Sequence, residues 1–370
     1  MKTQAAVIYE TGKPFEIEDL DLDGPREGEV LIQYLYAGLC HSDVHIAHGD
    51  LEARLPMVLG HEGAGIVLEV GAGVSRVKPG DHVVCSMIPN CGTCRYCATG
   101  RQALCDIGAQ ILEGYLPGGR FPITGPAGQY GAMCMLGTFS QYGVIHQNST
   151  IKVADDIPLD KAVLVGCGVP TGWGSAVYAA DVRAGQTVAI YGIGGIGANA
   201  VQGAVHAGAR NIVAIDPLEN KRAMALELGA THVFADAGEA LEAMTSMTRG
   251  QGADSAVLTP DLVTKQIVSD AFEAVGKGGV VVVTGLNKLM EPTIELPGSI
   301  LTLFKKTVKG SLFGDCNPTY DIPRILDLYV AGKFKLDELL TRTYTLDQIN
   351  LGYDDLLHGK NIRGVVTHQH

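Results

Sequence analysis

The sequence is short of positive charge, with 28 lysines and arginines against 40 aspartates and glutamates and a formal net charge of −12. An acidic surface repels phosphate backbones and anionic headgroups, so nucleic acid and anionic membranes are disfavoured as partners. No apolar run reaches the roughly eighteen residues that a transmembrane helix needs, so we expect no segment to span a membrane.

A secretory signal is also missing, because residues 1–7 read as a strand and carry no apolar leader core. The nine cysteines are therefore better interpreted as metal ligands than as disulfide partners. Charged residues make up only 18% of the 370 residues and hydrophobic ones 46%, which is ample for the cores of two or three domains. We expect a soluble cytoplasmic enzyme.

Four cysteines fall in one short segment with the spacing Cys91-x2-Cys94-x2-Cys97-x7-Cys105. A loop of this kind can bring four sulfurs to about 2.3 Å from one tetrahedral Zn²⁺. Chance thiols in a glycine-rich loop are the alternative, although such even spacings seldom arise by chance. The spacing predicts a closed, structural zinc site.

A second set of metal-type residues, Cys40, His61 and Cys167, lies outside this cysteine lobe. Taken alone, His61 would more often be a hydrogen-bonded loop histidine, and the two cysteines would be buried thiols. A closed site accompanied by a separate three-ligand set points to catalysis, because a catalytic zinc keeps its fourth position open.

The pattern of apolar residues changes near residue 169. Residues 1 to about 160 contain short strand-like runs broken by Gly, Pro and Asp, which predict a compact β-barrel or sandwich. From there on, apolar strands alternate with helix-period stretches, which predicts a parallel sheet covered by helices on both faces. The predicted strands are 187–191, 211–215, 232–235, 255–259, 279–284 and 307–313, and the predicted helices are 198–206, 218–228, 263–275 and 320–330.

A glycine-rich run joins the first strand of the alternating region to its first helix. Gly192 permits a tight turn, Gly194 lets a pyrophosphate approach the backbone, and Gly197 allows close packing of helix on strand. The N-terminus of the helix then offers its free N–H groups to the phosphates. The run predicts a dinucleotide site, and it reads Gly192-Ile193-Gly194-Gly195-Ile196-Gly197.

An acidic residue, Asp216, ends the next predicted strand. Its carboxylate can accept hydrogen bonds from both hydroxyls of the adenosine ribose and would repel a 2′-phosphate, which favours NAD over NADP. Lys221 could reach the same ribose from the following helix, although alone it would be a solvated lysine. A glycine-rich structural turn followed by an ordinary surface aspartate is the alternative.

The segment Gly60-His61-Glu62-Gly63-Ala64-Gly65, continuing to Gly71, resembles the signature of the zinc-containing medium-chain alcohol dehydrogenases. The resemblance spans nearly the whole chain and includes the cysteine lobe, the nucleotide fingerprint and segments 137–142, 166–168, 171–172, 309–310 and 362–363. It implies an α/β plus β fold: a GroES-like β-barrel catalytic domain of residues 1–168 and 313–370, and a Rossmann domain of residues 169–312 with a doubly wound parallel sheet.

The resemblance assigns Cys40, His61 and Cys167 to a catalytic zinc and Glu62 to the neighbouring acid, with Asp43 orienting the ligands. It therefore implies NAD and two Zn²⁺ per subunit. Zinc acts in such enzymes as a Lewis acid that lowers the pKa of the bound alcohol. Hydride then passes from the carbinol carbon to the nicotinamide, which makes primary alcohols and aldehydes the expected substrates.

Five further residues take roles from the same resemblance. Ser42 matches the hydroxyl that accepts the alcohol proton, and His45 matches the histidine that passes it, by way of the nicotinamide ribose, to solvent. Histidine suits this step because its unperturbed pKa is about 6.5. His41 and Arg363 match contacts to the cofactor pyrophosphate, and Thr171 matches a position near the nicotinamide.

The substrate is constrained only by mainly apolar pocket positions, which favour small to medium primary alcohols over charged ones. A branch of glutathione-dependent formaldehyde dehydrogenases holds its thiol conjugate with an acid and an arginine. Asp50 stands at the position of the acid here, but Ala109 stands where the arginine would be. The family's pocket positions correspond to Ser42, Leu51, Met87, Phe139 and Leu286.

Segments 100–109 and 165–174 resemble an actinobacterial branch that keeps NAD(H) bound and recycles it with a second redox partner, so that dye acceptors support turnover. A zinc-free reductase on the same fold and a non-catalytic nucleotide-binding protein would share parts of the pattern. The retained metal-type residues and relay residues argue against both. The family pairs subunits through the last strand of its Rossmann sheet, so a homodimer or homotetramer is expected.

Overall fold

The computed structural model describes all of residues 1–370, which form two compact units. One unit contains residues 1–167 and 317–370, and the other contains residues 168–316. The structure keeps residues 313–316 with the second unit, beyond the boundary at 312/313 that the sequence suggests. Phe313 and Cys316 are buried there, and the Cys316 thiol donates to the carbonyl of Pro170 at 3.4 Å.

Five short strands of the first unit close into a barrel in the order β1-β2-β7-β8-β4. The side chains that point inward are apolar, among them Val7, Leu20, Ile123 and Tyr130, and they pack as one cluster. The strands are β1 Lys2–Ile8, β2 Glu16–Leu22, β4 Met57–Val58, β7 Ile123–Gly125 and β8 Gly128–Ala132.

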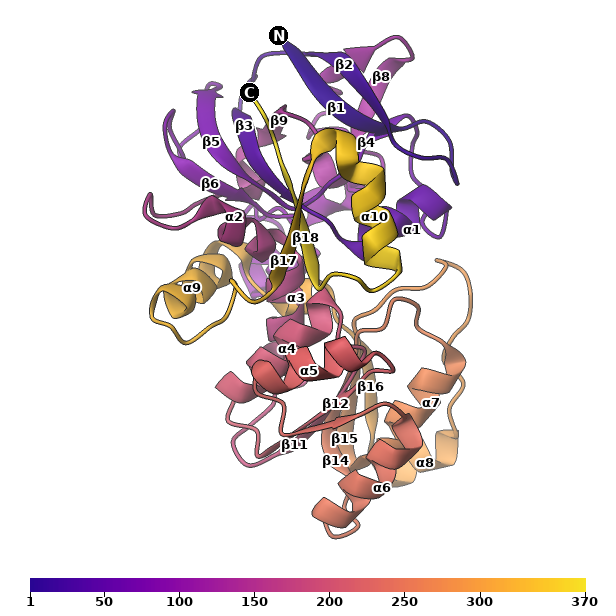
Figure 1. The fold of residues 1–370 in the computed structure, drawn as a ribbon. Helices are drawn as coiled ribbons and strands as arrows, with labels where there is room; N and C mark the ends of the chain where they lie inside the picture. Colours follow the sequence, from indigo (N-terminus) through magenta and orange to yellow (C-terminus); the bar gives the residue numbers. More distant parts are fainter. The chain divides into compact units, whose positions relative to one another are not determined.

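A larger sheet in the same unit has the order β10-β6-β5-β3-β18-β17, and β9 also pairs with β3. Its last two strands come from the C-terminal tail, and β18 runs antiparallel to β3. Figure 1 shows this yellow strand lying beside the indigo β3. The strands are β3 Glu29–Gly38, β5 Gly63–Val70, β6 His82–Cys85, β9 Tyr142–His146, β10 Thr150–Lys152, β17 Leu340–Thr345 and β18 Arg363–Thr367.

Four α-helices belong to the first unit: α1 His41–His48, α2 Leu159–Ala162, α9 Pro318–Val330 and α10 Ile349–Leu357. Helix α1 begins after the extended residue Cys40 and ends at Gly49, whose φ of 83° lies in the left-handed region that glycine adopts without strain. The sequence pattern had predicted no helix in this segment. Short 3-10 helices occupy 97–99, 102–104 and 106–110 in the cysteine lobe and 163–166 just before Cys167.

The second unit is built on a six-stranded sheet in the order β13-β12-β11-β14-β15-β16, with every pairing parallel. The central strand β11 is buried along its whole length, as expected of a parallel strand covered on both faces. The predicted parallel sheet is therefore confirmed; β13 and β16 end earlier than predicted, and β14 and β15 begin earlier and end one residue earlier. The strands are β11 Thr187–Tyr191, β12 Asn211–Ile215, β13 His232–Phe234, β14 Ala253–Leu258, β15 Val275–Val283 and β16 Thr307–Gly310.

Helices cover both faces of this sheet: α4 packs with α3 and α5, and α6 packs with α7 (Figure 1). Helix α6 was not predicted. Trp173, the single tryptophan, is buried in α3, and its indole N–H donates to Nδ1 of His206 on α4 at 3.0 Å. The helices are α3 Gly168–Gly174, α4 Gly195–His206, α5 Glu219–Glu227, α6 Ala237–Met247, α7 Lys265–Ala274 and α8 Gly298–Leu303, with a π-helical turn at Ser175–Ala179.

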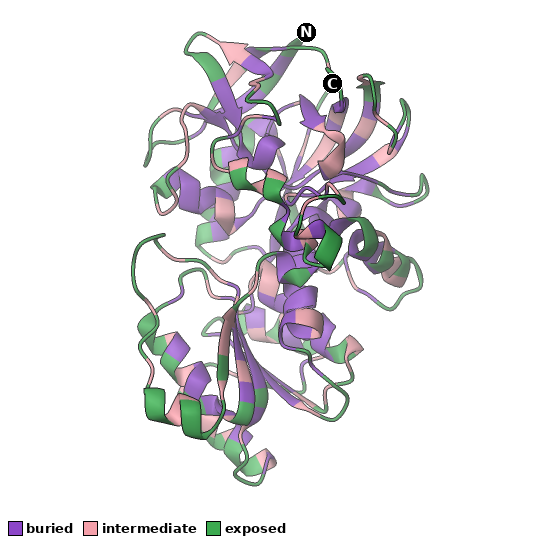
Figure 2. Cartoon of the chain, turned by 180° about the vertical axis from the view of Figure 1, so that it is seen from behind, coloured by how far each residue is buried: buried purple, intermediate pink, exposed green.

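Many of the buried residues in each unit lie in its strands, as the purple colouring of Figure 2 shows. No single helix has the length and apolar composition needed to cross a membrane, and one bent pair of consecutive helices, 159–166 with 168–179, meets that test only when the two are taken together.

Candidate metal and dinucleotide sites

The four cysteines of the lobe converge on one point. Their sulfurs all lie within 4.8 Å of one another, and Sγ of Cys91 is 3.8 Å from Sγ of Cys97. Thiolates at about 2.3 Å from one tetrahedral zinc lie about 3.8 Å apart, so the arrangement fits that ion. Backbone N–H groups also point at the sulfurs, from Cys94 to Cys91 at 3.3 Å and from Cys97 to Cys94 at 3.4 Å. None of the nine cysteines forms a disulfide.

The lobe thiols have divergent acidities. Burial opposes ionisation of Cys91, but N–H groups of Cys94 and Thr93 outweigh it and lower the pKa of Cys91 to about 6. Burial raises the pKa of Cys97 to about 12. A divalent cation bound by all the sulfurs would displace the remaining protons, so its affinity must fall as pH falls.

A second cluster gathers Cys40, His61, Glu62 and Cys167, which are remote from one another in sequence apart from the adjacent pair 61–62. Their potential ligand atoms lie within 4.8 Å of one another, and all four side chains are buried. Cys40 precedes α1, His61 and Glu62 precede β5, and Cys167 ends the N-terminal segment of the first unit. The predicted three-ligand set is thus brought together by the fold, with a carboxylate beside it.

His61 is oriented in a way that suits a metal ligand. Its Nδ1 lies 3.2 Å from Oδ1 of Asp43, which also accepts the N–H of Gly60 at 2.9 Å. Its Nε2 is buried and has no hydrogen-bond partner. A histidine held by a carboxylate at one nitrogen and left unpaired at the other matches the carboxylate–histidine–zinc arrangement.

The two cysteines of this cluster titrate as a pair. A hydrogen bond from Cys167 lowers the pKa of Cys40 well below its ordinary value, although burial opposes this. The same hydrogen bond and burial raise the pKa of Cys167. The pair therefore favours one thiolate and one thiol, and a bound cation would be needed to hold both as thiolates.

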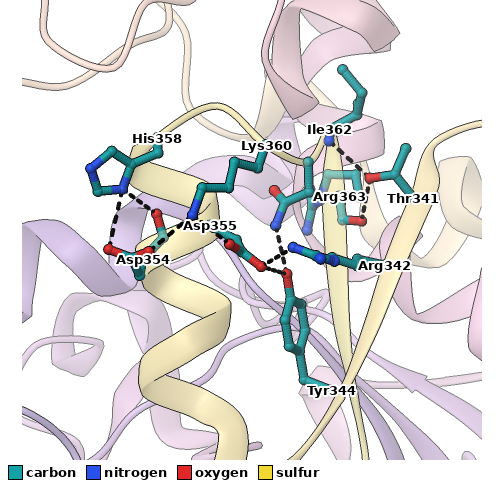
Figure 3. A network of polar contacts seen from close by, with 10 residues as sticks. Thr341, Arg342, Tyr344, Asp354, Asp355, His358, Lys360, Ile362 and Arg363 are labelled. Carbon is teal, nitrogen blue, oxygen red and sulfur yellow. Dashed lines mark hydrogen bonds and ion pairs between the residues drawn. The ribbon is translucent and has the colours of Figure 1, made fainter.

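An ion pair between Arg363 and Glu62 lies beside the cluster, with both side chains buried. Arg363 begins β18, and its backbone is fixed because Thr341 donates to the carbonyl of Arg363 at 3.3 Å and accepts the N–H of Ile362 at 3.0 Å (Figure 3). The resemblance assigns Arg363 to the cofactor pyrophosphate, and that role stays a prediction. The structure places its guanidinium on Glu62, and Gly38 leaves the room, since a Cβ there would lie 2.0 Å from Oε2 of Glu62.

The expected relay residues lie on α1. His41 and Ser42 occupy its first two positions, and Oγ of Ser42 lies 3.7 Å from Sγ of Cys40. His45 is on the next turn, with its side chain 7% exposed, and its Nδ1 lies 2.9 Å from Oδ2 of Asp50. Asp50, which the resemblance aligns with an acid for thiol conjugates, is thus paired with a histidine.

The glycine run closes β11 and begins α4 as predicted. Gly192 has a φ of 86°, and a Cβ on Gly197 would lie 1.9 Å from the carbonyl of Gly192, so both positions need glycine. Gly194 caps the helix, which Gly195 and Ile196 then open. A residue that sequence reasoning missed, Thr259 directly after β14, holds the loop by donating to the carbonyl of Gly192 at 2.6 Å. Its place at the end of a predicted strand was the only signal for it.

Asp216 follows β12 and is buried. Its Oδ2 accepts the N–H of Ile193 at 2.7 Å and its Oδ1 accepts that of Leu218 at 2.9 Å, so the carboxylate braces the glycine loop. Burial lowers the pKa of the buried Lys221, and the nearby Asp216 opposes this. Thr171 is buried on α3, and its carbonyl accepts the hydroxyl of Ser175 at 2.7 Å.

Two family models match the chain. Residues 26–155 match the Alcohol dehydrogenase GroES-like domain, and residues 195–331 match the Zinc-binding dehydrogenase domain. Together they cover more than half of the sequence.

Relatives align along the full length. An NDMA-dependent alcohol dehydrogenase of Amycolatopsis methanolica is 62% identical over 100% of this chain and 99% of its own. The S-(hydroxymethyl)glutathione dehydrogenase of Paracoccus denitrificans is 36% identical, covering 100% of both chains. Among solved structures, the benzyl alcohol dehydrogenase of Acinetobacter calcoaceticus superposes with a TM-score of 0.92 at 30% identity over 100% of both chains.

Proposed function

Because this chain belongs to the zinc-containing medium-chain alcohol dehydrogenase family, we propose that it oxidises primary alcohols to aldehydes, reversibly, with NAD and two zinc ions per subunit. The observation that carries the proposal is the convergence of Cys40, His61 and Cys167, with Nε2 of His61 buried and unpaired. Zinc held by these residues would supply Lewis acidity toward the alcohol oxygen, and NAD would supply the hydride acceptor.

The side chains of α1 provide a route for the proton. Ser42 lies beside Cys40, so its hydroxyl is placed to accept the proton of the alcohol. His45, one turn further along α1, would hold that proton before solvent takes it, and Asp50 fixes which nitrogen of the ring is free to do so. Asp43 orients His61 through its hydrogen bond to Nδ1, and the ion pair with Arg363 holds Glu62. Both contacts keep the cluster in place.

The pocket positions support an uncharged substrate. Met87 is one of these positions, and its Sδ lies 3.0 Å from Sγ of Cys167, beside the cluster. Phe139 is buried nearby in the core of the same unit. Such surroundings favour small to medium apolar alcohols. Benzyl alcohol is a reasonable first substrate, since a structural relative is named for it.

Replacing one ligand in each cluster tests the two zinc assignments. We expect Cys167→Ser to hold one zinc per subunit instead of two and to lose turnover by roughly a hundredfold or more, because several kcal/mol of charge stabilisation are removed. Cys94→Ser should also lose one zinc, but from the lobe. Zinc is counted by elemental analysis after dialysis, and benzyl alcohol oxidation is measured in parallel. Full turnover in Cys167→Ser would disprove the catalytic assignment.

A second candidate is a nicotinoprotein, which keeps NAD bound and recycles it with another redox carrier. The observation in its favour is the 62% identical relative, whose name states dependence on NDMA. We would assay benzyl alcohol oxidation with an electron-accepting dye, with and without added NAD. Turnover without added NAD supports the bound-cofactor reaction, whereas a strict requirement for added NAD supports an exchangeable cofactor.

A thiol-dependent formaldehyde dehydrogenase is a weaker candidate, although one relative is named S-(hydroxymethyl)glutathione dehydrogenase. Asp50 is paired with His45, and Ala109 offers no charge for an anionic conjugate.

We also propose a homodimer or homotetramer. Strand β16 is an edge of the sheet, and Leu303 near it is 76% exposed. Light scattering on the purified protein measures the mass directly.

A further inference from the structure

An arginine outside the cysteine lobe reaches toward it. Arg76 lies in the loop between β5 and β6, and its Nη2 donates to the carbonyl of Asn90 at 2.6 Å. Asn90 immediately precedes Cys91. The other terminal nitrogen, Nη1, is buried and has no hydrogen-bond partner. A buried guanidinium donor without an acceptor is costly, so its surroundings should supply negative charge in the functional protein.

The carbonyl that anchors Arg76 belongs to a rigid residue. The backbone N–H of Asn90 donates to the carbonyl of Asn148 at 2.8 Å, and its side-chain N–H₂ donates to Asn317 at 2.8 Å and to Thr319 at 2.9 Å. Its Oδ1 accepts the N–H of Gly92 at 3.1 Å. Every polar group of Asn90 is therefore used, and the guanidinium is held at one fixed place at the entrance to the lobe.

The negative charge available at that place is on sulfur. The hydrogen bond to Asn90 holds the guanidinium next to Cys91. Burial lowers the pKa of Arg76, and the thiols of Cys91, Cys97 and Cys105 act in the opposite direction. Four thiolates around one Zn²⁺ carry a net charge of −2, and a partly buried charge of that size requires a counter-ion.

Other cations of the lobe face elsewhere. The guanidinium carbons of Arg95 and Arg101 lie over the ring of Tyr96, at 4.5 Å and 5.2 Å from its centroid. Both side chains are exposed. Solvent screens their charge, so Arg76 is the cation placed to act on the thiolates.

We propose that Arg76 is the counter-ion of the four-thiolate zinc site and slows the loss of that zinc. With its Nη2 anchored on Asn90, its Nη1 is free to donate to the sulfurs once they are ionised. The inference rests on the structural zinc site proposed above, and it assigns a role in metal retention to a residue that lies outside the Cys91–Cys105 segment.

The test measures zinc release from the full-length protein. Wild type, Arg76→Gln, Arg76→Lys and the matched control Arg101→Gln are mixed with excess EDTA, and the zinc left on the protein is followed by elemental analysis. We expect Arg76→Gln to release one of its two zincs about 10–100-fold faster, because loss of an outer-shell partner typically lowers metal affinity by that factor and a weaker complex dissociates faster. Arg76→Lys should fall between Arg76→Gln and wild type, and Arg101→Gln should match wild type.

A pH series separates charge from simple loosening of the loop. A cation next to the thiols favours thiolate, so removing it should let protons displace zinc at a higher pH than in wild type. A purely structural role would speed release without moving that midpoint. Release by Arg76→Gln at the wild-type rate, or with an unshifted midpoint, overturns the inference. A wild type that holds only one zinc, together with a Cys94→Ser variant that loses none, would overturn the structural zinc site itself.

Discussion

Single hydrogen bonds decide what several of the titratable side chains can do. His45 has one nitrogen occupied by Asp50, and His61 has one nitrogen occupied by Asp43, so each ring offers only its other nitrogen for chemistry. In both cases the carboxylate selects the tautomer and the ring orientation. The two histidines then diverge because His61 faces two thiols, whereas His45 lies buried in the last turn of α1 against Asp50.

At this scale we expect Asp50→Ala to slow alcohol oxidation about tenfold, a part of the roughly 10²–10⁴-fold that a positioned acid–base group contributes. The ring of His45 would lose its fixed orientation, and proton release would become slower. The solvent deuterium isotope effect on kcat should rise, which loss of packing alone would not cause. Asp50→Asn, which can still accept the Nδ1–H, is the control, and its rate should lie between those of wild type and Asp50→Ala. An unchanged rate in Asp50→Ala would show that His45 needs no such support.

Elements matter where they deliver residues to a site. Helix α1 carries His41, Ser42 and His45, yet its eight residues are too polar and too short for the sequence pattern to indicate a helix. Its ends are set by tertiary contacts and by Gly49 instead. Strand β18 similarly delivers Arg363 at one end and leads to His368 at the other, where Nε2 lies 2.9 Å from the carbonyl of Thr138.

His368, directly after β18, should make the stability of the protein depend on pH. Burial lowers the pKa of His368 from 6.5 to about 4, because the charged ring is disfavoured in the interior. The unfolded chain therefore binds a proton more readily between these values, so stability is full above pH 6.5 and is lost as pH falls toward 4. The loss from this group is about 3 kcal/mol. Denaturant unfolding of wild type and His368→Gln at pH 7 and pH 4 measures it as the difference between their pH dependences. Equal dependences would contradict the assignment.

Across the whole molecule, the two chemistries are divided between the two units. The metal-type residues and the proposed relay residues of α1 lie in residues 1–167 and 317–370, and the glycine run, Asp216 and Thr171 lie in residues 168–316. The chain passes from Cys167 to Thr171 within four residues, so the boundary separates a metal-type residue from a residue expected near the nicotinamide.

This division predicts that nucleotide and zinc can be lost separately. Asp216→Ser removes the carboxylate that accepts N–H groups from Ile193 and Leu218, so the loop loosens and any ribose contact is lost. We expect nucleotide affinity to fall about 10–100-fold, equivalent to roughly 1.4–2.8 kcal/mol, while zinc content stays at the wild-type value. Nucleotide affinity is measured by calorimetric titration with NAD and by the amount of nucleotide released on denaturation. Zinc content is measured by elemental analysis. Zinc lost together with nucleotide would contradict the division.

The sequence predicted those parts of the molecule that depend on local pattern. Continuous apolar runs located β11 and β12 to the residue, because a strand buried on both faces must be apolar throughout. Spacing placed the cysteine lobe, and the resemblance placed Cys40, His61 and Cys167. The Asp50–His45 pair, the Thr259 bond to the glycine loop and the position of Arg76 depend on side chains meeting across folded segments, which no periodicity encodes.

The buried contact between Trp173 and His206 gives the protein an optical probe of its own. Trp173 is the only indole in the chain, so its emission comes from one place, the contact of α3 with α4. Trp173 lies two residues after Thr171 on α3, and His206 lies on α4, the helix that begins within the glycine run. Intrinsic fluorescence can therefore report nucleotide binding without a label, and each spectral change can be assigned to a single residue.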